Sequence, residues 1–545
     1  MIVAPPMNAR ARAKRLALVL AGLTLALAAA ACSDSSSRSG SDGAPKDTGS
    51  AERAAVAEGG PGGDAPVSRP DVRRDGSSPN ADSTRDAPVV TDLAPAPEGG
   101  TCAPVVAKAS PDAWAMRHPS AGFGGIVTQN SGGHQDVFLL SPTKQFRIGA
   151  RLDWGGTVVF FGISADPASN VIDANDPGRE LQIAIYDPDR NRQGCAYNAT
   201  CASSSATCGN SITFLGWNPV QGGDECQHGA PVTQHGQSGD ALRLVIKPLQ
   251  WNPDWNAPDC RKSACGASGV PVDVTYTFEL RYVREHVVEV MTQVQSAETI
   301  DHAPTRQELP TLYVSNGKGG PDLPLLLDAA GNAVALNTPA NDGFLTGAFV
   351  SPRPWVSWQN AARNYGVGLA MDQGITNWDG WRGDGNNAPY FHNVRARITF
   401  GLRKQGLVRG LSYLALGGFS TVAAELDAVL RKRPPFGTLD APAWSATTQY
   451  TAGQPLALAG WVLDTTKNNR VFAAIDGTVV KELTVGAARP DVCAVYPAYA
   501  GCPSVGFSGS ISTANLGSCP RLLTVTARDV DGNETVIGER RLVAR

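Results

Sequence analysis

Strict alternation of apolar and polar residues marks the middle of the chain. From 272 to 282 the even positions carry valine, tyrosine, phenylalanine or leucine, and the odd positions carry Asp273, Thr275, Thr277, Glu279 and Arg281. A period of two is expected of a β-strand that buries one face. The segment "HVVEVMTQVQ" follows directly, separated by a tight "VRE" connection, so the pattern predicts a β-hairpin.

The same alternation recurs elsewhere and indicates the fold class. Apolar residues at 394, 396, 398, 400 and 402 oppose Arg395, Arg397, Thr399 and Arg403, and "TVVFFGI" and "ALRLVIKPLQW" are further strand candidates. So many strands within more than 300 residues predict an all-β protein whose central part is a large two-sheet sandwich. One helix is expected near the end of this region, capped by Ser420 or Thr421 and stopped by two prolines after residue 433.

The N-terminus has the pattern of an export signal. Four basic residues lie between 10 and 15, and an uncharged apolar run from Leu16 to Ala31 follows them and ends in small residues. Cys32 comes next, and the junction "LAAAAC" resembles the bacterial lipobox. That resemblance implies cleavage after residue 31 and lipidation of Cys32, which would make lipid the membrane attachment. A plain secreted protein cut near Ala31, or an uncleaved anchor, is the alternative.

Composition divides the rest of the chain into three parts. Residues 32–102 are rich in Ser, Asp, Gly, Pro and Ala and show no sustained periodicity, so we expect a disordered tether. Residues 103–434 are assigned to the central β-sandwich and 435–545 to a small β-domain. A net charge of −3 and the lack of an extended basic stripe give no indication of a nucleic-acid partner.

The small C-terminal part carries its own motifs. A "GW" pair at Gly460 and Trp461, "RPDV" at 489–492, "YP" at 496–497 and "TVTARDVDGN" at 524–533 occur in order. This pattern resembles the Ig-like modules appended to exported bacterial proteins. The resemblance implies a spacer or adhesive module without catalytic residues.

Cysteine usage agrees with export. Apart from Cys32 there are ten cysteines, enough for five disulfides, with seven between 102 and 265 and three at 493, 502 and 519. Because each group contains an odd number of cysteines, either one disulfide joins the two groups or two thiols stay free. The close pairs Cys260 with Cys265 and Cys493 with Cys502 are the expected loop staples. Irregular spacing in an oxidising compartment disfavours a zinc site, and we expect no metal or cofactor.

The segment "NDPGRELQIAIYDPDR" at 175–190 combines a strand pattern with unusual polar residues. Its Leu and Ile residues at 181, 183 and 185 are predicted to face the core, which leaves Glu180, Gln182 and Tyr186 on the other face. That face is either simply solvated or part of a ligand site. Segments that carry indole rings beside amides and carboxylates, such as "GWNPVQGGDE" and "NWDGWRGDGNN", favour a site for sugars, whose flat faces stack on aromatic rings.

The order of "NDPGRELQ", "WNPVQGGD", "QELP" and a late Trp-rich loop resembles exported proteins with the galactose-mutarotase supersandwich of carbohydrate-active enzymes. The resemblance implies a concave sheet face that holds glycans. The candidate catalytic residues are Glu308, Asp379 and His392, with Glu308 first among the acids. The candidate substrate-binding residues are Arg179, Glu180, Trp217, Asp224 and Trp378.

Two catalytic chemistries are open for such a site. A glycoside hydrolase needs two carboxyl groups, one protonated and one ionised. A polysaccharide lyase needs a Tyr or His base and a cation beside the uronate, for which Tyr186, His392 and Arg179 are available.

Three functions follow from these observations. The first is an exported, lipid-anchored surface protein that binds and cleaves extracellular polysaccharide, and the second is a glycan-binding or adhesive lipoprotein without activity. The third is a structural protein of the cell envelope. The motifs "GxSxG" and "HExxH" are absent, so the sequence does not favour a serine hydrolase or a zinc protease.

Overall fold

The computed structural model describes residues 117–175, 180–186, 219–220, 228–250, 271–299, 301–339, 344–372, 374–383, 391–443, 445, 447–467, 469–496 and 499–545. Strands dominate these residues, so the all-β fold class is confirmed. The signal segment, Cys32 and the tether lie outside the described residues, as do Arg179, Trp217 and Asp224.

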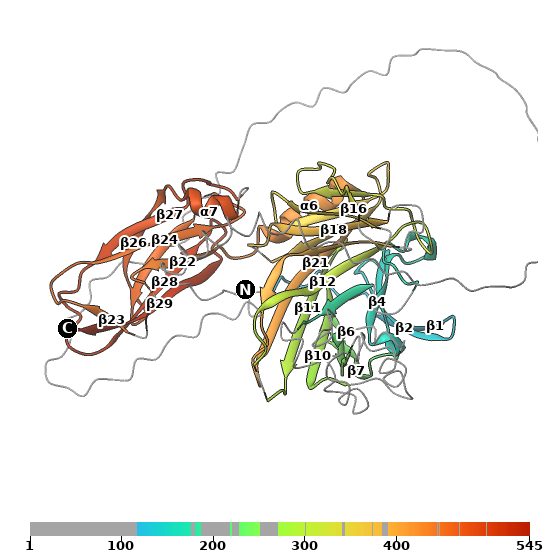
Figure 1. The fold of residues 1–545 in the computed structure, drawn as a ribbon, viewed down its shortest axis with the longest axis horizontal. Coiled ribbons are helices and arrows are strands. Elements are labelled where there is room, and N and C mark those ends of the chain that lie inside the picture. The colour runs from blue at the N-terminus through green and yellow to red at the C-terminus, as the bar shows by residue number, and fades with distance from the viewer. Residues whose placement is uncertain are drawn as a thin grey trace, which may run out of the picture. The chain divides into compact units, whose positions relative to one another are not determined.

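Three antiparallel sheets form the central β region (Figure 1). Sheet I contains β1 (Ile126–Ser131), β2 (His134–Leu140), β3 (Phe146–Arg151) and β4 (Thr157–Ile163). Sheet II contains, in spatial order, β13 (Leu325–Asp328), β16 (Trp355–Gln359), β17 (Gly366–Met371), β21 (Leu407–Leu416), β11 (Val287–Ser296), β10 (Val274–Arg284), β8 (Ala241–Ile246) and β7 (Val232–Ser238).

Sheet III contains, in spatial order, β14 (Thr338–Pro339), β15 (Phe344–Val350), β18 (Asn377–Gly383), β19 (Phe391–Ala396), β12 (Thr305–Ser315) and β20 (Ile398–Phe400). The short strand β5 (Leu181–Ala184) also pairs with β12. Two further short strands, β6 (Pro219–Val220) and β9 (Leu249–Gln250), pair with each other.

One apolar core holds these sheets together. The even residues of β10, such as Phe278 and Leu280, pack in the same cluster as Leu312 and Val394 of sheet III and Ile148 of sheet I. The predicted hairpin is confirmed, because β10 and β11 pair antiparallel from Val274↔Ser296 onward. The alternation of residues along each strand therefore decides which side chains enter the core.

The second face of β10 is not solvated, although the alternation of apolar and polar residues predicts a solvent-exposed face there. Thr277 and Glu279 are buried. On this side of sheet II the helix α6 (Phe419–Leu430) packs on β16, β17 and β21 (Figure 1). The Arg117 side chain forms an ion pair with Glu279 of β10. The helix is the one predicted, although its N-cap is Gly418 rather than Ser420 or Thr421.

Buried carboxylates on sheet II are neutralised by arginines. Glu289 is 0% exposed and accepts hydrogen bonds from Arg117 Nε at 2.7 Å and Arg281 Nη2 at 2.8 Å. Glu279 accepts a further bond from Arg117 Nη1 at 2.6 Å. Removing a charge from water is costly unless an opposite charge compensates it, so this cluster depends on all of its members.

The C-terminal β region has its own apolar core, which includes Leu458, Phe507 and Val525. Its strands are β22 (Phe436–Ala441), β23 (Thr448–Tyr450), β24 (Leu456–Leu463), β25 (Arg470–Ile475), β26 (Thr478–Ala487), β27 (Gly506–Ile511), β28 (Arg521–Arg528) and β29 (Glu534–Ala544). The helix α7 (Pro490–Val495) begins with a proline, which has no N–H to leave unsatisfied in the first turn.

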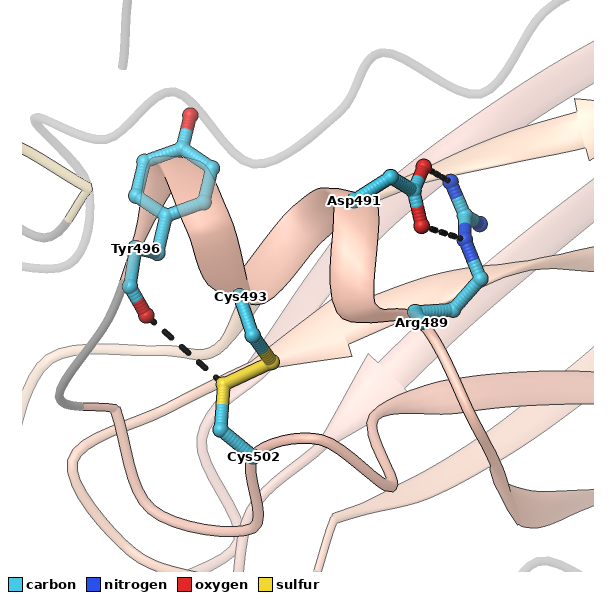
Figure 2. The surroundings of a disulfide bond; sticks show 5 residues. All are labelled: Arg489, Asp491, Cys493, Tyr496 and Cys502. Carbon is cyan, nitrogen blue, oxygen red and sulfur yellow. Dashed lines mark hydrogen bonds and ion pairs between the residues drawn. A yellow bond between two sulfur atoms is a disulfide. The ribbon is translucent and has the colours of Figure 1, made fainter.

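A disulfide joins Cys493 of α7 to Cys502, as the sequence predicted (Figure 2). The Arg489 guanidinium forms a two-bond ion pair with Asp491 at the start of the same helix, at 2.9 and 2.8 Å (Figure 2). Cys519 is also disulfide-bonded.

We predict that Glu289→Gln destabilises the central β region by about 3 kcal/mol, because it leaves two buried guanidinium groups with one carboxylate fewer. Urea unfolding of the two proteins measures the difference. Asp273→Asn is the control, since its ion pair with Lys247 spans 3.8 Å between exposed side chains and should contribute less than about 1 kcal/mol. Equal stability of Glu289→Gln and the original protein would contradict the prediction.

Candidate functional site

A polar row crosses the face of sheet III that points away from the core. In register, Gln182 of β5 lies opposite Thr311 of β12, Thr311 opposite Arg395 of β19, and Arg395 opposite Asp379 of β18. Side chains at paired positions point to the same face of a sheet. The four polar groups therefore lie side by side, while the next row, which includes Leu312 and Val394, enters the core.

Glu308 lies at the centre of this face. Its carboxylate forms an ion pair with Arg395 and accepts hydrogen bonds from the Tyr186 hydroxyl at 3.0 Å and the Thr311 hydroxyl at 2.7 Å. A register shift between Glu308 and Thr311 interrupts the pairing of β12 with β5 at this point. The irregularity brings residues three apart on one strand within hydrogen-bonding distance.

The Tyr186 phenol is held in place through its main chain. The Gln307 side-chain amide accepts a hydrogen bond from Tyr186 N at 2.5 Å and donates one to Tyr186 O at 3.0 Å. Burial raises the pKa of Tyr186 well above its usual value, and the negative charge of Glu308 raises it further. The phenol is therefore protonated at neutral pH and acts as a hydrogen-bond donor to Glu308.

Asp379 is the second carboxylate of the face. It accepts a hydrogen bond from Arg397 Nε at 2.7 Å, and Arg306 Nη1 lies 3.9 Å from its other oxygen. The Arg395 guanidinium lies over the Trp381 ring, 4.6 Å from its centroid. Burial by itself would lower the pKa of Arg395, but the nearby carboxylates, Glu308 first, raise it above its usual value.

The face is accessible from outside the protein. The side chains of Arg395 and Arg397 are 28% and 32% exposed, and that of Arg306 is 65% exposed. Trp381 is half-buried, and the carboxylates of Glu308 and Asp379 lie deeper. We call these six residues the sheet III face.

His392 is not part of this face, which corrects its predicted role beside Glu308 and Asp379. Its ring is buried and stacks on Trp358, with centroids 5.1 Å apart, on the core side of β19. Its Nδ1 accepts a hydrogen bond from Gly383 N at 3.1 Å. Burial, assisted by the charge of Arg382, lowers the pKa of His392 to about 4.

Trp378 cannot stack on a sugar as predicted, because its indole is 0% exposed within the main core. It precedes Asp379 on β18 and so points to the opposite face. Glu180 is also buried, and its carboxylate accepts a hydrogen bond from Thr157 of sheet I at 3.0 Å. Of the residues named from the sequence, the structure brings together Glu308 and Asp379; Arg179, Trp217 and Asp224 lie outside the described residues.

The arginines of the site were not among the predicted site residues, although the sequence pattern could have identified them. Arg395 and Arg397 alternate with apolar residues, so the period of two placed both on one face. Trp381 lies two residues after Asp379 on the same strand and shares its face by the same rule. Only the pairing of β19 with β18 on one side and with β12 on the other, which sequence periodicity does not specify, brings the arginines to the carboxylates.

The described ranges hold no group of three or more His, Cys, Asp or Glu side chains that could bind a metal ion. In the same ranges, no helix is both long and apolar enough to cross a membrane.

No protein-family model matches the chain, and no curated protein is similar to it in sequence. Among solved structures, the Slr1438 protein from Synechocystis sp. PCC 6803 is similar over 56% of this chain and 100% of its own, at 12% identity and a TM-score of 0.33. A candidate mutarotase, YeaD from Salmonella typhimurium, is similar over 55% of this chain and 97% of its own, at 10% identity and a TM-score of 0.30. A polysaccharide lyase is similar over 74% of this chain and 47% of its own, at 10% identity and a TM-score of 0.29.

We predict that His392 makes folding dependent on pH. Its pKa is about 4 in the folded protein and about 6.5 when unfolded, so its contribution is complete above pH 6.5 and is lost as pH falls toward 4. The loss amounts to about 3 kcal/mol. His392→Gln, which retains an acceptor for Gly383 N, should flatten the stability curve between these pH values. Parallel curves for the two proteins in urea unfolding would refute this role.

Proposed function

We propose that the sheet III face binds polysaccharide and that the chain is an exported glycan-binding protein. The observation that carries the proposal is the position of Arg395, whose guanidinium lies over Trp381 and forms an ion pair with Glu308. An aromatic ring beside planar donors and carboxylate acceptors matches a sugar, which offers a CH face to the ring and hydroxyls to the polar groups. The partly exposed arginines leave N–H donors available to a ligand.

Binding fits this geometry better than hydrolysis does. A glycosidase requires one of its two carboxyl groups to deliver a proton to the leaving oxygen. Here Glu308 and Asp379 each accept hydrogen bonds from an arginine. Tyr186 is a poor base for a lyase mechanism because burial raises its pKa. We therefore propose recognition without cleavage as the role of these residues.

Export supports a ligand outside the cell. The Cys493–Cys502 disulfide is typical of proteins that mature in an oxidising compartment. The apolar segment before Cys32 suits a lipoprotein signal, so we propose that a lipid on Cys32 anchors the protein in the bacterial cell envelope. The C-terminal β region then serves as a spacer or adhesive module.

We predict that Trp381→Ala weakens polysaccharide binding about tenfold, because a stacked aromatic ring contributes about 1 kcal/mol or more. A panel of polysaccharides, scored for binding and for released reducing ends, identifies the ligand and measures the effect. Trp381→Phe keeps a ring at the position and should retain most of the affinity. Reducing ends released by the original protein but not by Glu308→Gln would replace the binding proposal with a glycosidase.

We predict that Cys32→Ala moves the protein from the membrane fraction to the soluble fraction of the producing bacterium, since the variant has no thiol to receive lipid. Cell fractionation and metabolic labelling with a fatty acid measure both effects. A variant of a tether serine, Ser36→Ala, is the control and should remain membrane-bound. Membrane association that is unchanged in Cys32→Ala would exclude the lipid anchor.

A further inference from the structure

A second polar and aromatic surface lies on sheet I, on the face that points away from the main core. Val137, Leu139 and Ile148 enter the core, so their neighbours along β2 and β3 point outward. Phe138 and Phe160 form a small separate cluster on this outer face, with Trp154 packed against it. We call the surface around Phe138, Phe160 and Trp154 the sheet I face.

A glycine allows the two phenyl rings to meet. In register, Phe138 of β2 lies opposite Gly149 of β3, and Gly149 lies opposite Phe160 of β4. A Cβ atom on Gly149 would lie 2.3 Å from the Phe138 ring, so no other residue fits there without displacing it. The ring centroids are 5.8 Å apart at 80°, an edge-to-face arrangement.

Arg147 lies on these rings. Its guanidinium carbon is 4.3 Å from the Phe138 centroid and 4.7 Å from the Phe160 centroid. Its Nη1 donates to the Gln129 side chain at 3.3 Å, and its Nε is buried with no hydrogen-bond partner. The two rings hold the guanidinium at this position, and the second amino group, Nη2, has no hydrogen bond to another described residue.

Within the described part of the chain, Arg147 forms no ion pair with a carboxylate. The nearby carboxylate, Asp136, already accepts two bonds from Arg151, at 2.8 and 3.0 Å. Burial lowers the pKa of Arg147, and Asp136 opposes that effect only from a distance. Among the residues that the structure describes, the arginines that do reach a carboxylate include Arg117, Arg151, Arg281, Arg395, Arg397 and Arg433.

A partly desolvated cation without a counter-ion attracts an anion more strongly than a solvated cation does. Groups that suit a sugar surround it: the Gln129 amide donates and accepts, and the Trp154 ring lies at the edge of the cluster. Arg151 lies over Trp154, 4.4 Å from the ring, and His134 contacts the same ring, 5.1 Å between centroids. The surroundings favour an acidic sugar over a simple inorganic anion.

We propose that the sheet I face is a second ligand site, in which Arg147 binds the carboxylate or sulfate group of an acidic polysaccharide. The site shares no residue with the sheet III face and does not depend on its function. A chain with two such faces would hold one polymer at two points or two polymers at once.

The test measures binding of two acidic polymers to the purified protein, polygalacturonate with carboxylates and dextran sulfate with sulfates. Neutral dextran and the acidic polypeptide poly-glutamate are the comparison ligands. We expect Arg147→Gln to bind one of the two acidic polymers roughly tenfold more weakly, since it removes a charge-assisted hydrogen bond. Arg147→Lys retains the charge but not the planar fork, so its affinity should be intermediate. Arg541→Gln removes one charge from an exposed residue elsewhere and should bind within about twofold of the original protein.

Two further measurements keep this test independent of folding and of the sheet III face. Arg147→Gln loses the contacts with Phe138 and Phe160, so its thermal midpoint should fall by a few degrees, and binding is compared at a temperature at which both proteins are fully folded. Introducing Arg147→Gln into Trp381→Ala should cause the same fold-change as it does alone, as expected for separate sites. A failure of the polysaccharide proposal for Trp381 would then leave the Arg147 result unaffected.

Four outcomes would overturn the inference. The first is that Arg147→Gln and the original protein bind both acidic polymers equally well, and the second is that Arg147→Gln loses as much affinity for dextran as for the acidic polymers. The third is that the original protein binds neither acidic polymer. The fourth is that it binds poly-glutamate as tightly as the acidic polysaccharides. The last outcome would assign the site to an acidic peptide instead. Preference between polygalacturonate and dextran sulfate decides whether the anionic group is a carboxylate or a sulfate.

Discussion

The packing of sheets II and III against each other determines which side chains can meet a ligand. Because successive residues of a strand point to opposite faces, each residue placed in the shared core sends its neighbours outward. Trp378 enters the core and Asp379 therefore faces out; Val394 enters and Arg395 faces out. The sheet III face is thus a consequence of where the apolar residues are buried.

Arginine is the common means by which this protein keeps carboxylates at partly buried positions. Glu289 on sheet II and Glu308 on sheet III both accept bonds from guanidinium groups, although the first is sealed from solvent and the second lies beneath exposed arginines. The same chemistry supports stability in one place and recognition in the other. Access to solvent, rather than the kind of side chain, separates the two roles.

Local sequence patterns were sufficient to predict individual strands, but they were insufficient to predict which elements pack beside each strand. The alternation at 272–282 predicted β10 and its hairpin, but Arg117 pairs with the buried Glu279 on the face that the pattern marked as polar. The acids Glu308 and Asp379 could be named from the short motifs "QELP" and "NWDGW", in which they stand beside an amide and indole rings. Their partner Arg395 comes from a different strand, and only the order of strands in sheet III places it between them. Single-strand periodicity contains no information on that order.

The Gln307 side chain has a structural consequence beyond the position of Tyr186. Its oxygen and one of its N–H groups act in the manner of a peptide group and satisfy both main-chain polar groups of Tyr186, while Nε2 also donates to Phe400 O at 3.0 Å. The strand β5 can therefore end at Ala184 while Tyr186 stays attached to β12 through a side chain instead of main-chain pairing. A side chain of this kind replaces the main-chain partner that is missing at the end of a strand, and so it holds the Tyr186 phenol where its hydroxyl reaches Glu308.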